Sequence, residues 1–186
     1  DKPPLDVDAV IKAITTIQDE TNKQSIYTEK GEVKIKSPSP ILLVVLGDLH
    51  IGNQATDHKK TLEIMKTIRD TPNTFAVFNG DLVDNLFVFR KGGAEEAMTA
   101  EMQGMIAMQF MSELDDMGKV ISVATGNHDG FVDNFYRTFS RLKAPLYYNW
   151  GDTDISLGGL MYRLAQFHEF TMGNSTMSHT LRELKY

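Results

Sequence analysis

The sequence has no cysteine among its 186 residues. This absence excludes disulfide bonds and metal sites built on thiolates, so any bound metal must use histidine, aspartate, glutamate or asparagine. The sequence also lacks an apolar run near the roughly 20 residues that a membrane-spanning helix needs, and no signal peptide is visible. We therefore predict a protein that does not enter a membrane, and the lack of cysteine favours a cytoplasmic location.

Positive charge is also scarce, with 19 lysines and arginines against 25 acidic residues and a net charge of −6. This balance argues against a protein that coats nucleic acid through nonspecific charge. Negatively charged substrates stay open, because two bound divalent cations would add four positive charges to one cleft. With 41% hydrophobic residues the chain can bury one real core, which predicts one compact domain with an appended arm.

Residues 1–40 differ in pattern from the rest and form the predicted arm. Residues 6–20 carry apolar side chains at helical spacing, and residues 25–36 alternate in polarity around a turn at 29–31. These patterns predict a helix followed by a hairpin. The prolines within 37–40 make a stiff connector that cannot be helical. We expect the arm to pack as an extra edge hairpin rather than to fold as an independent module.

Residues 41–186 form the predicted main domain, in which buried strands alternate with helices. Such alternation is typical of an α/β fold. The predicted strands are 41–46, 75–78 and 119–124, the predicted helices are 56–70, 95–117 and 129–142, and two or three short strands fall within 146–167. Methionines three or four residues apart in the second helix indicate a core-facing stripe made of Met98, Met102, Met105, Met108 and Met111.

Each of the three predicted buried strands ends in a polar turn that contains glycine. The turns are Gly47-Asp48-Leu49-His50, Gly80-Asp81-Leu82-Val83-Asp84-Asn85 and Gly126-Asn127-His128-Asp129. Ligands of open α/β sheets bind outside the carboxyl ends of the strands, so we expect all three turns to face one crevice. Their carboxylate, imidazole and amide groups suit divalent Mn, Fe, Zn or Mg ions. The sequence therefore predicts a metal site at this edge.

The three turns together resemble the motifs of the calcineurin-like metallophosphoesterases. The resemblance covers roughly residues 41–180 and implies a four-layer α/β/β/α sandwich with a dinuclear metal centre at the strand ends. It implies that Asp48 and His50 bind the first metal, that Asp81 bridges both metals, and that Asn127 binds the second.

The same resemblance assigns a catalytic role to His128, which would contact the substrate phosphate and the leaving group. Asp84 would hydrogen-bond His128, fix its orientation and favour its charged form. His168 follows directly on a predicted strand, and the resemblance implies that it binds the second metal.

Three further residues are weighed for a role in binding substrate. The stretch from Glu169 to His179 resembles a subset of the family common in phage and prophage genomes, which points to a bacterial or phage-infected cell and makes His179 a candidate substrate contact. Arg90 lies in an aromatic and basic loop after the second turn and is another candidate, since such a loop could hold a base. His58 begins the first helix of the main domain and is expected to be a solvated surface residue.

Two departures from the family pattern affect the prediction. Asn85 and Leu86 stand where protein Ser/Thr phosphatases carry Arg-Gly, which disfavours that branch. The family's final Gly-His-x-His motif, which gives one more ligand to each metal, is absent from the sequence. We therefore expect the main domain to be truncated at its C-terminus.

The resemblance implies hydrolysis of a phosphate ester by two divalent cations that share a bridging hydroxide, with manganese favoured over iron, zinc and magnesium. A phosphodiester substrate, in a nucleotide or nucleic acid, is slightly favoured. Two alternatives stay open: a phosphomonoesterase, and a non-catalytic binding or assembly module that keeps the fold. A homodimer is compatible with the sequence because many relatives pair, although no residue indicates one.

Overall fold

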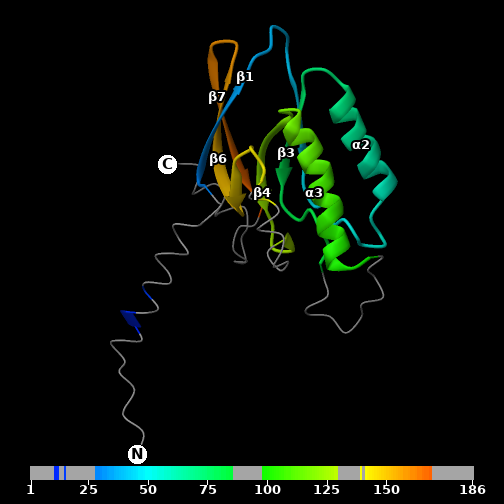
Figure 1. The fold of residues 1–186 in the computed structure, drawn as a ribbon. Helices are drawn as coiled ribbons and strands as arrows, with labels where there is room; N and C mark the ends of the chain where they lie inside the picture. The colour runs from blue at the N-terminus through cyan, green and yellow to red at the C-terminus, as the bar shows by residue number, and fades with distance from the viewer. Residues whose placement is uncertain are drawn as a thin grey trace, which may run out of the picture.

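A computed structural model of the chain describes residues 11–12, 15, 28–85, 98–129, 139 and 141–168. Strands and helices alternate along these residues, as the sequence predicts for an α/β fold (Figure 1). The strands are β1 Lys30–Ile35, β2 Leu42–Leu46, β3 Thr74–Asn79, β4 Val120–Thr125, β5 Leu146–Tyr148, β6 Trp150–Leu157 and β7 Leu160–Phe167. Two helices are complete within the described residues, α2 His58–Asp70 and α3 Ala100–Asp116, and no helix in this part of the chain is long and apolar enough to cross a membrane.

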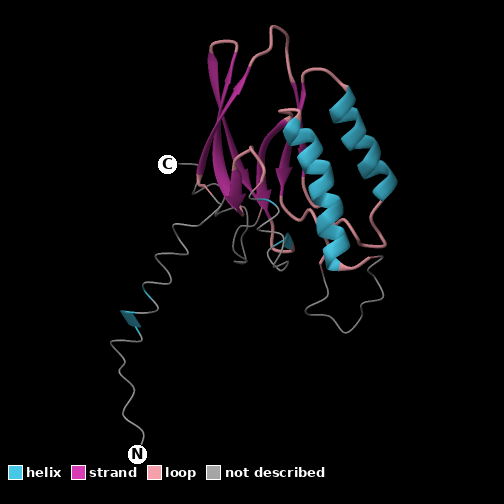
Figure 2. Cartoon of the chain, viewed as in Figure 1, coloured by secondary structure: helices cyan, strands magenta, loops and turns pink. Residues whose placement is uncertain are grey.

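The strands form two sheets. β2, β3, β4 and β5 form a parallel sheet in that order, and in the second sheet β6 lies between a parallel β1 and an antiparallel β7. Both helices cover the outer face of the four-stranded sheet (Figure 2). The described residues therefore show three layers. Among them no helix covers the outer face of β1, β6 and β7, so the second helical layer of the predicted sandwich is not seen in this part of the chain.

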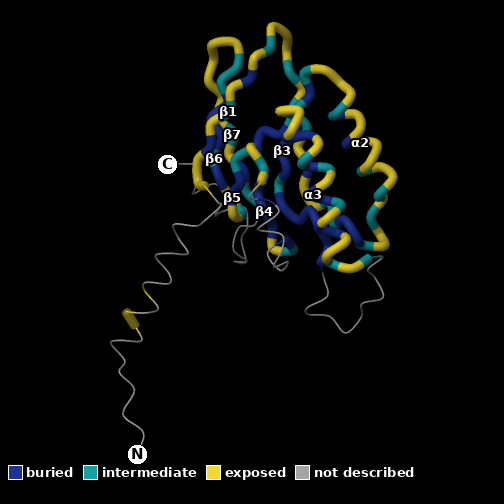
Figure 3. Tube along the Cα trace, viewed as in Figure 1, coloured by how far each residue is buried: buried dark blue, intermediate teal, exposed yellow. Residues whose placement is uncertain are grey.

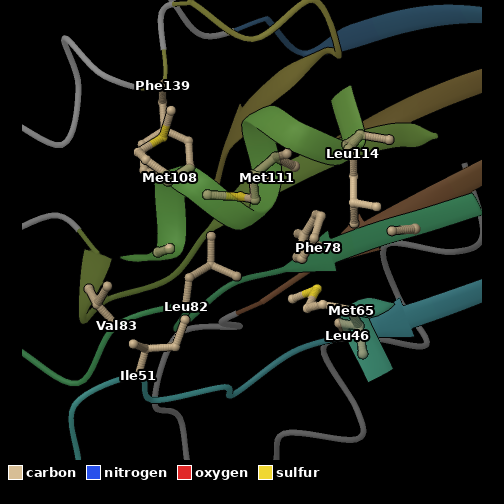
Figure 4. Packing of buried hydrophobic residues seen from close by; sticks show 14 of the residues in the cluster. Leu46, Ile51, Met65, Phe78, Leu82, Val83, Met108, Met111, Leu114 and Phe139 are labelled. Carbon is tan, nitrogen blue, oxygen red and sulfur yellow. The ribbon is translucent and has the colours of Figure 1, made fainter. Parts of the chain in front are cut away.

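Hydrophobic residues lie on both faces of the four-stranded sheet, and the innermost segments of the chain trace are buried (Figure 3). The larger cluster lies between this sheet and the helices, where Phe78 of β3 packs near Met111 and Leu114 of α3 (Figure 4). The smaller cluster lies between the two sheets and comprises Ile35, Val77, Ile121 and Ile155. Every residue of β4 is buried, as expected for a central parallel strand covered on both faces.

Both helices begin at a side-chain cap. The Asp57 carboxylate accepts a hydrogen bond from the Lys60 N–H at 2.9 Å, and the Thr99 hydroxyl accepts one from the Met102 N–H at 3.3 Å. Such caps satisfy main-chain donors that the first helical turn cannot pair internally. These caps fix the residues at which α2 and α3 begin, and therefore where the preceding loops end.

The methionine stripe predicted for α3 is only partly correct. Met108 and Met111 are buried, but Met102 and Met105 are exposed. The buried face of α3 instead begins with Gln103 and Gly104, so the stripe of core positions is rotated away from the first methionines.

The hairpin predicted around residues 29–31 is wrong. Residues 30–35 form the single edge strand β1, which pairs in parallel with β6. Gly31 lies inside this strand because its Cα passes close to Pro145 and Tyr147, where a side chain would collide. Likewise, Gly151 lies inside β6 rather than between strands, and a Cβ there would meet the ring of Tyr147.

Two predicted helices lie largely outside the described residues. Of the predicted helix 6–20, residues 11, 12 and 15 are described and helical, and of the predicted helix 129–142, residue 139 is helical.

Candidate metal centre

The three polar turns meet at the carboxyl edge of the four-stranded sheet. Asp48 and His50 follow β2, Asp81 follows β3, and Asn127 and His128 follow β4. The turns are hydrogen-bonded to one another, because the N–H groups of Asp48 and His50 donate to the carbonyls of Gly80 and Asp81, each at 3.0 Å. Parallel pairing of β2, β3 and β4 brings these residues to one place, as the sequence predicts.

His168 joins the turns from the second sheet, directly after β7. The end of β7 is tied to the end of β3 by two side chains: Gln166 Nε2 donates to the Phe78 carbonyl at 3.0 Å, and Asn79 Nδ2 donates to the Phe167 carbonyl at 3.1 Å. The His168 N–H donates to the Asn149 carbonyl at 2.8 Å. These bonds fix the position of the imidazole next to the turns.

The backbone of the turns is unusual. Asp48, His50, Asp81 and Asn85 have φ angles of 51°, 41°, 49° and 42°, in the left-handed region that residues with a Cβ rarely occupy. Such conformations persist where the surrounding structure holds them, and they cluster at functional sites. Here they turn the chain sharply at the strand ends.

Asp81 is the centre of the site. Its side chain is only 7% exposed, and its Oδ1 accepts a hydrogen bond from the His128 N–H at 2.9 Å. Its Oδ2 faces three imidazole nitrogens: Nε2 of His168 lies at 3.2 Å, and Nε2 of His50 and of His128 each lie at 3.9 Å. A buried carboxylate is costly unless it is paired with positive charge or a metal.

The three imidazoles share one arrangement. Nδ1 of His50 lies 3.0 Å from Oδ1 of Asp84, Nδ1 of His168 lies 2.9 Å from the Asn79 carbonyl, and Nδ1 of His128 contacts the Asp84 carbonyl. Because each partner is an acceptor, these contacts place a proton on Nδ1 and turn Nε2 of each ring toward Asp81. Histidines that bind metals are typically held in this way.

The ligand atoms fall into two groups that share Asp81. His50, Asp81 and His128 form one group, and Asp48, Asp81 and His168 form the other; within each group the atoms lie within 4.8 Å of one another. Oxygen and imidazole donors of this kind fit Mn, Fe, Zn or Mg. The grouping differs from the predicted pairing of Asp48 with His50, because Asp48 lies with His168 and His128 lies with His50.

Asn127 also lies against Asp81. Its side-chain amide lies 3.1 and 3.2 Å from the two carboxylate oxygens of Asp81. With its NH₂ turned inward the amide donates to Asp81, and with its oxygen turned inward it adds a ligand beside the carboxylate. The predicted ligands Asp48, His50, Asp81, Asn127 and His168 are thus gathered in one place, and their donor set fits a divalent cation.

The prediction for Asp84 needs a correction. Asp84 contacts His128 through its main-chain carbonyl, whereas its carboxylate binds Nδ1 of His50 and accepts a hydrogen bond from Asn53 Nδ2 at 3.0 Å. The Asp84 side chain is almost completely buried. Asp84 therefore orients both imidazoles with different atoms.

One carboxylate and one imidazole at the site, those of Asp129 and His168, have shifted pKa values. Burial raises the pKa of Asp129 to about 6, opposed by hydrogen bonds from the N–H groups of Gly126, Val83 and Leu82. Burial lowers the pKa of His168, but the Asn79 carbonyl and the Asp81 carboxylate outweigh it, and the net shift is upward. Asp129 ties the second turn to the third, a role that its place in the third motif does not reveal.

His58 has a structural role that the sequence does not predict. Its Nε2 accepts a hydrogen bond from the Gly52 N–H at 2.9 Å, so it is half-buried beneath the loop that carries His50 rather than solvated. The two predicted substrate contacts, Arg90 and His179, lie outside the described residues.

Comparison with known proteins agrees with this geometry. The family model of the calcineurin-like phosphoesterases matches residues 41–175, well over half of the chain. No curated protein matches the chain. The matched segment contains all three turns and His168, so the chain belongs to the calcineurin-like phosphoesterase family.

Proposed function

We propose that the chain hydrolyses phosphate esters with two divalent cations held by Asp48, His50, Asp81, Asn127 and His168. The observation that carries the proposal is the arrangement of three imidazoles around Asp81, each with Nδ1 bonded to an acceptor and Nε2 directed at the Asp81 carboxylate. Family membership supports a metal-dependent phosphoesterase. When bound, the cations supply Lewis-acid polarisation of the phosphate and activation of a water molecule.

Asp81 suits the role of a shared ligand. It belongs to both groups of candidate ligands, and its Oδ1 is held by the His128 N–H. With little exposure to solvent, its charge is poorly screened and favours cations strongly. Asp48, by contrast, is mostly exposed and closes the site on its solvent side.

His128 suits the role of a group that acts on the substrate. The Asp84 carbonyl keeps a proton on Nδ1, so Nε2 is the nitrogen that can hold or give a proton within the site. A proton at Nε2 would stabilise negative charge on a phosphate oxygen or pass to the leaving oxygen. His128 also lies in a group of candidate ligands with His50 and Asp81. Substituting His128 therefore distinguishes a role as a metal ligand from a role in acting on the substrate.

The preference for a phosphodiester, in a nucleotide or nucleic acid, remains part of the proposal. It rests on the loop that contains Arg90 and on the stretch that ends at His179, both outside the described residues. The two substrate classes are therefore compared directly in the test.

The test measures hydrolysis of bis(4-nitrophenyl) phosphate and of 4-nitrophenyl phosphate, with and without Mn²⁺. The variant is Asp81→Asn, and the matched control is Asp116→Asn, the same change at an exposed position at the end of α3. We expect turnover only with metal, faster on the diester, and at least about 100-fold slower in Asp81→Asn, since it loses a shared ligand. Metal-independent turnover, or equal effects of the two substitutions, would contradict the proposal. Mn²⁺ binding without hydrolysis of either ester would favour the non-catalytic module.

A further inference from the structure

Gln103 is a polar residue on the core face of α3. Its side chain is completely buried, on the same face of the helix as Ala107, Met111 and Leu114. A buried carboxamide costs free energy unless its oxygen and nitrogen are hydrogen-bonded. Its partners therefore indicate why a polar residue stands there.

The carboxamide binds the main chain of the second turn. Oε1 accepts hydrogen bonds from the N–H groups of Asp84 at 3.1 Å and Asn85 at 2.9 Å, and Nε2 donates to the Met98 carbonyl at 3.1 Å. One oxygen thus accepts from two neighbouring buried N–H groups, at the point where Asn85 has a left-handed backbone; the Asp84 N–H also donates to the Ile51 carbonyl at 3.1 Å.

The bonds that orient two imidazoles depend on this piece of main chain. The Asp84 carboxylate binds Nδ1 of His50, the Asp84 carbonyl binds Nδ1 of His128, and Asn85 Nδ2 donates to the His128 carbonyl at 3.2 Å. A shift of Asp84 would therefore move both imidazoles relative to Asp81.

Gln103 also packs against the loop that carries His50. Gly52, with φ of +108°, lies so close to Gln103 that a Cβ there would come within 3.0 Å of its side-chain atoms. On the other side of this loop, the Gly52 N–H is bonded to His58. The His50 loop and the Asp84 turn thus rest on the same buried carboxamide.

We propose that Gln103 is a positioning residue for the metal centre. It holds the main chain of Asp84 and Asn85 where Asp84 orients His50 and His128, although it touches neither metal nor substrate. The link to metal binding rests on the proposed function, whereas the hold on the main chain is a property of the protein without metal. The two parts are therefore measured separately.

The test uses two substitutions of Gln103 and one control. Gln103→Met keeps the approximate size and removes both acceptor and donor, whereas Gln103→Glu keeps an oxygen that accepts both N–H groups but buries a carboxylate and loses the donor to the Met98 carbonyl. Leu114→Val loosens the same face of α3 without contact to the turns and is the control. Circular dichroism establishes folding, hydrogen exchange of the Asp84 and Asn85 amides is measured without metal, and Mn²⁺ affinity is measured by titration calorimetry.

We expect Gln103→Met to speed exchange of the Asn85 amide by about 10-fold or more, with a smaller effect on the Asp84 amide, which keeps its bond to the Ile51 carbonyl, and to weaken Mn²⁺ binding about 10–100-fold. In a folded Gln103→Glu the Asn85 amide exchanges within about threefold of the wild type because its acceptor is kept, although the buried carboxylate lowers overall stability. Leu114→Val changes neither exchange nor affinity selectively. A folded Gln103→Met with unchanged exchange and affinity would overturn the inference. So would a folded Gln103→Glu in which the Asn85 amide exchanges about 10-fold or more faster than in the wild type, a result that decides the matter even where the methionine variant does not fold.

A wild-type protein that binds no Mn²⁺ would defeat the proposed function. The exchange measurement would still decide whether Gln103 holds the turn, so the two failures are distinguishable.

Discussion

Replacing Gly80 with alanine tests how tightly the second turn is packed against the second sheet. Gly80 has a φ of +79°, and a Cβ there would lie closer than 3.0 Å to Cγ, Nδ1 and Cβ of His168. His168 cannot move aside easily, because its side chain is only 7% exposed and its Nδ1 is bonded to the Asn79 carbonyl. Gly158, in the turn between β6 and β7, is the control: its φ is +61°, and a Cβ there meets no atom of the described residues within 4 Å.

The two substitutions share one cost and differ in another. Placing a Cβ on a left-handed residue costs about 1–2 kcal/mol, and this applies to both glycines. Gly80→Ala adds overpacking of about 1–3 kcal/mol and the loss of a hydrogen bond worth about 1 kcal/mol. We therefore expect Gly80→Ala to destabilise the protein by about 2–4 kcal/mol more than Gly158→Ala.

Urea unfolding without metal measures this difference. Trp150 is the single tryptophan, and it pairs with Phe167 next to His168, so its fluorescence reports on this part of the fold. Mn²⁺ titration of the same proteins should show that Gly80→Ala loses binding and Gly158→Ala keeps it. Equal destabilisation by the two substitutions, with Mn²⁺ binding intact in both, would refute the packing argument.

Three further predictions concern the site, the second sheet and the edge of the first sheet. His128→Ala should lower turnover about 100-fold or more while Mn²⁺ affinity changes only a few-fold; a matching loss of affinity would make His128 a ligand instead. Hydrogen bonds from Arg163 and Lys30 lower the pKa of Asp154 to about 2 from an ordinary 3.8, so this interaction stabilises the fold above pH 4 and is lost as the pH falls toward 2. The stability advantage over Asp154→Asn in urea should therefore shrink over that range, and a constant difference would contradict this. Val45 is 58% exposed on the edge strand β2, so Val45→Lys should change stability by no more than about 0.5 kcal/mol in thermal unfolding, and a larger loss would mean that something covers this edge.

Much of the site could be predicted because it follows from local rules. Buried parallel strands end at one edge of a sheet, so Asp48, Asp81 and Asn127 had to come together once the strands were identified. His168 could be placed through its position after a predicted strand and the family resemblance. These inferences need only sequence spacing and sheet geometry.

The missed features depend on contacts between residues distant in sequence. In the sequence Gln103 is one polar residue in a methionine-rich helix, and its role depends on hydrogen bonds from the N–H groups of Asp84 and Asn85. The role of His58 likewise depends on its hydrogen bond from the Gly52 N–H. Gly31 suggests a turn in the sequence, but in the structure it allows Pro145 and Tyr147 to pack closely against the backbone of β1. A sequence shows where glycine occurs and leaves open whether it serves a turn or a close contact.

Metal binding by Asp81 is the central claim, and calorimetric titration of the metal-free protein with Mn²⁺ tests it most directly. We predict binding of two ions per chain to the wild type and to Asp116→Asn, and loss of both ions in Asp81→Asn, because Asp81 belongs to both groups of ligands. A wild type that binds no Mn²⁺, or an Asp81→Asn protein that binds as the wild type does, would contradict the account.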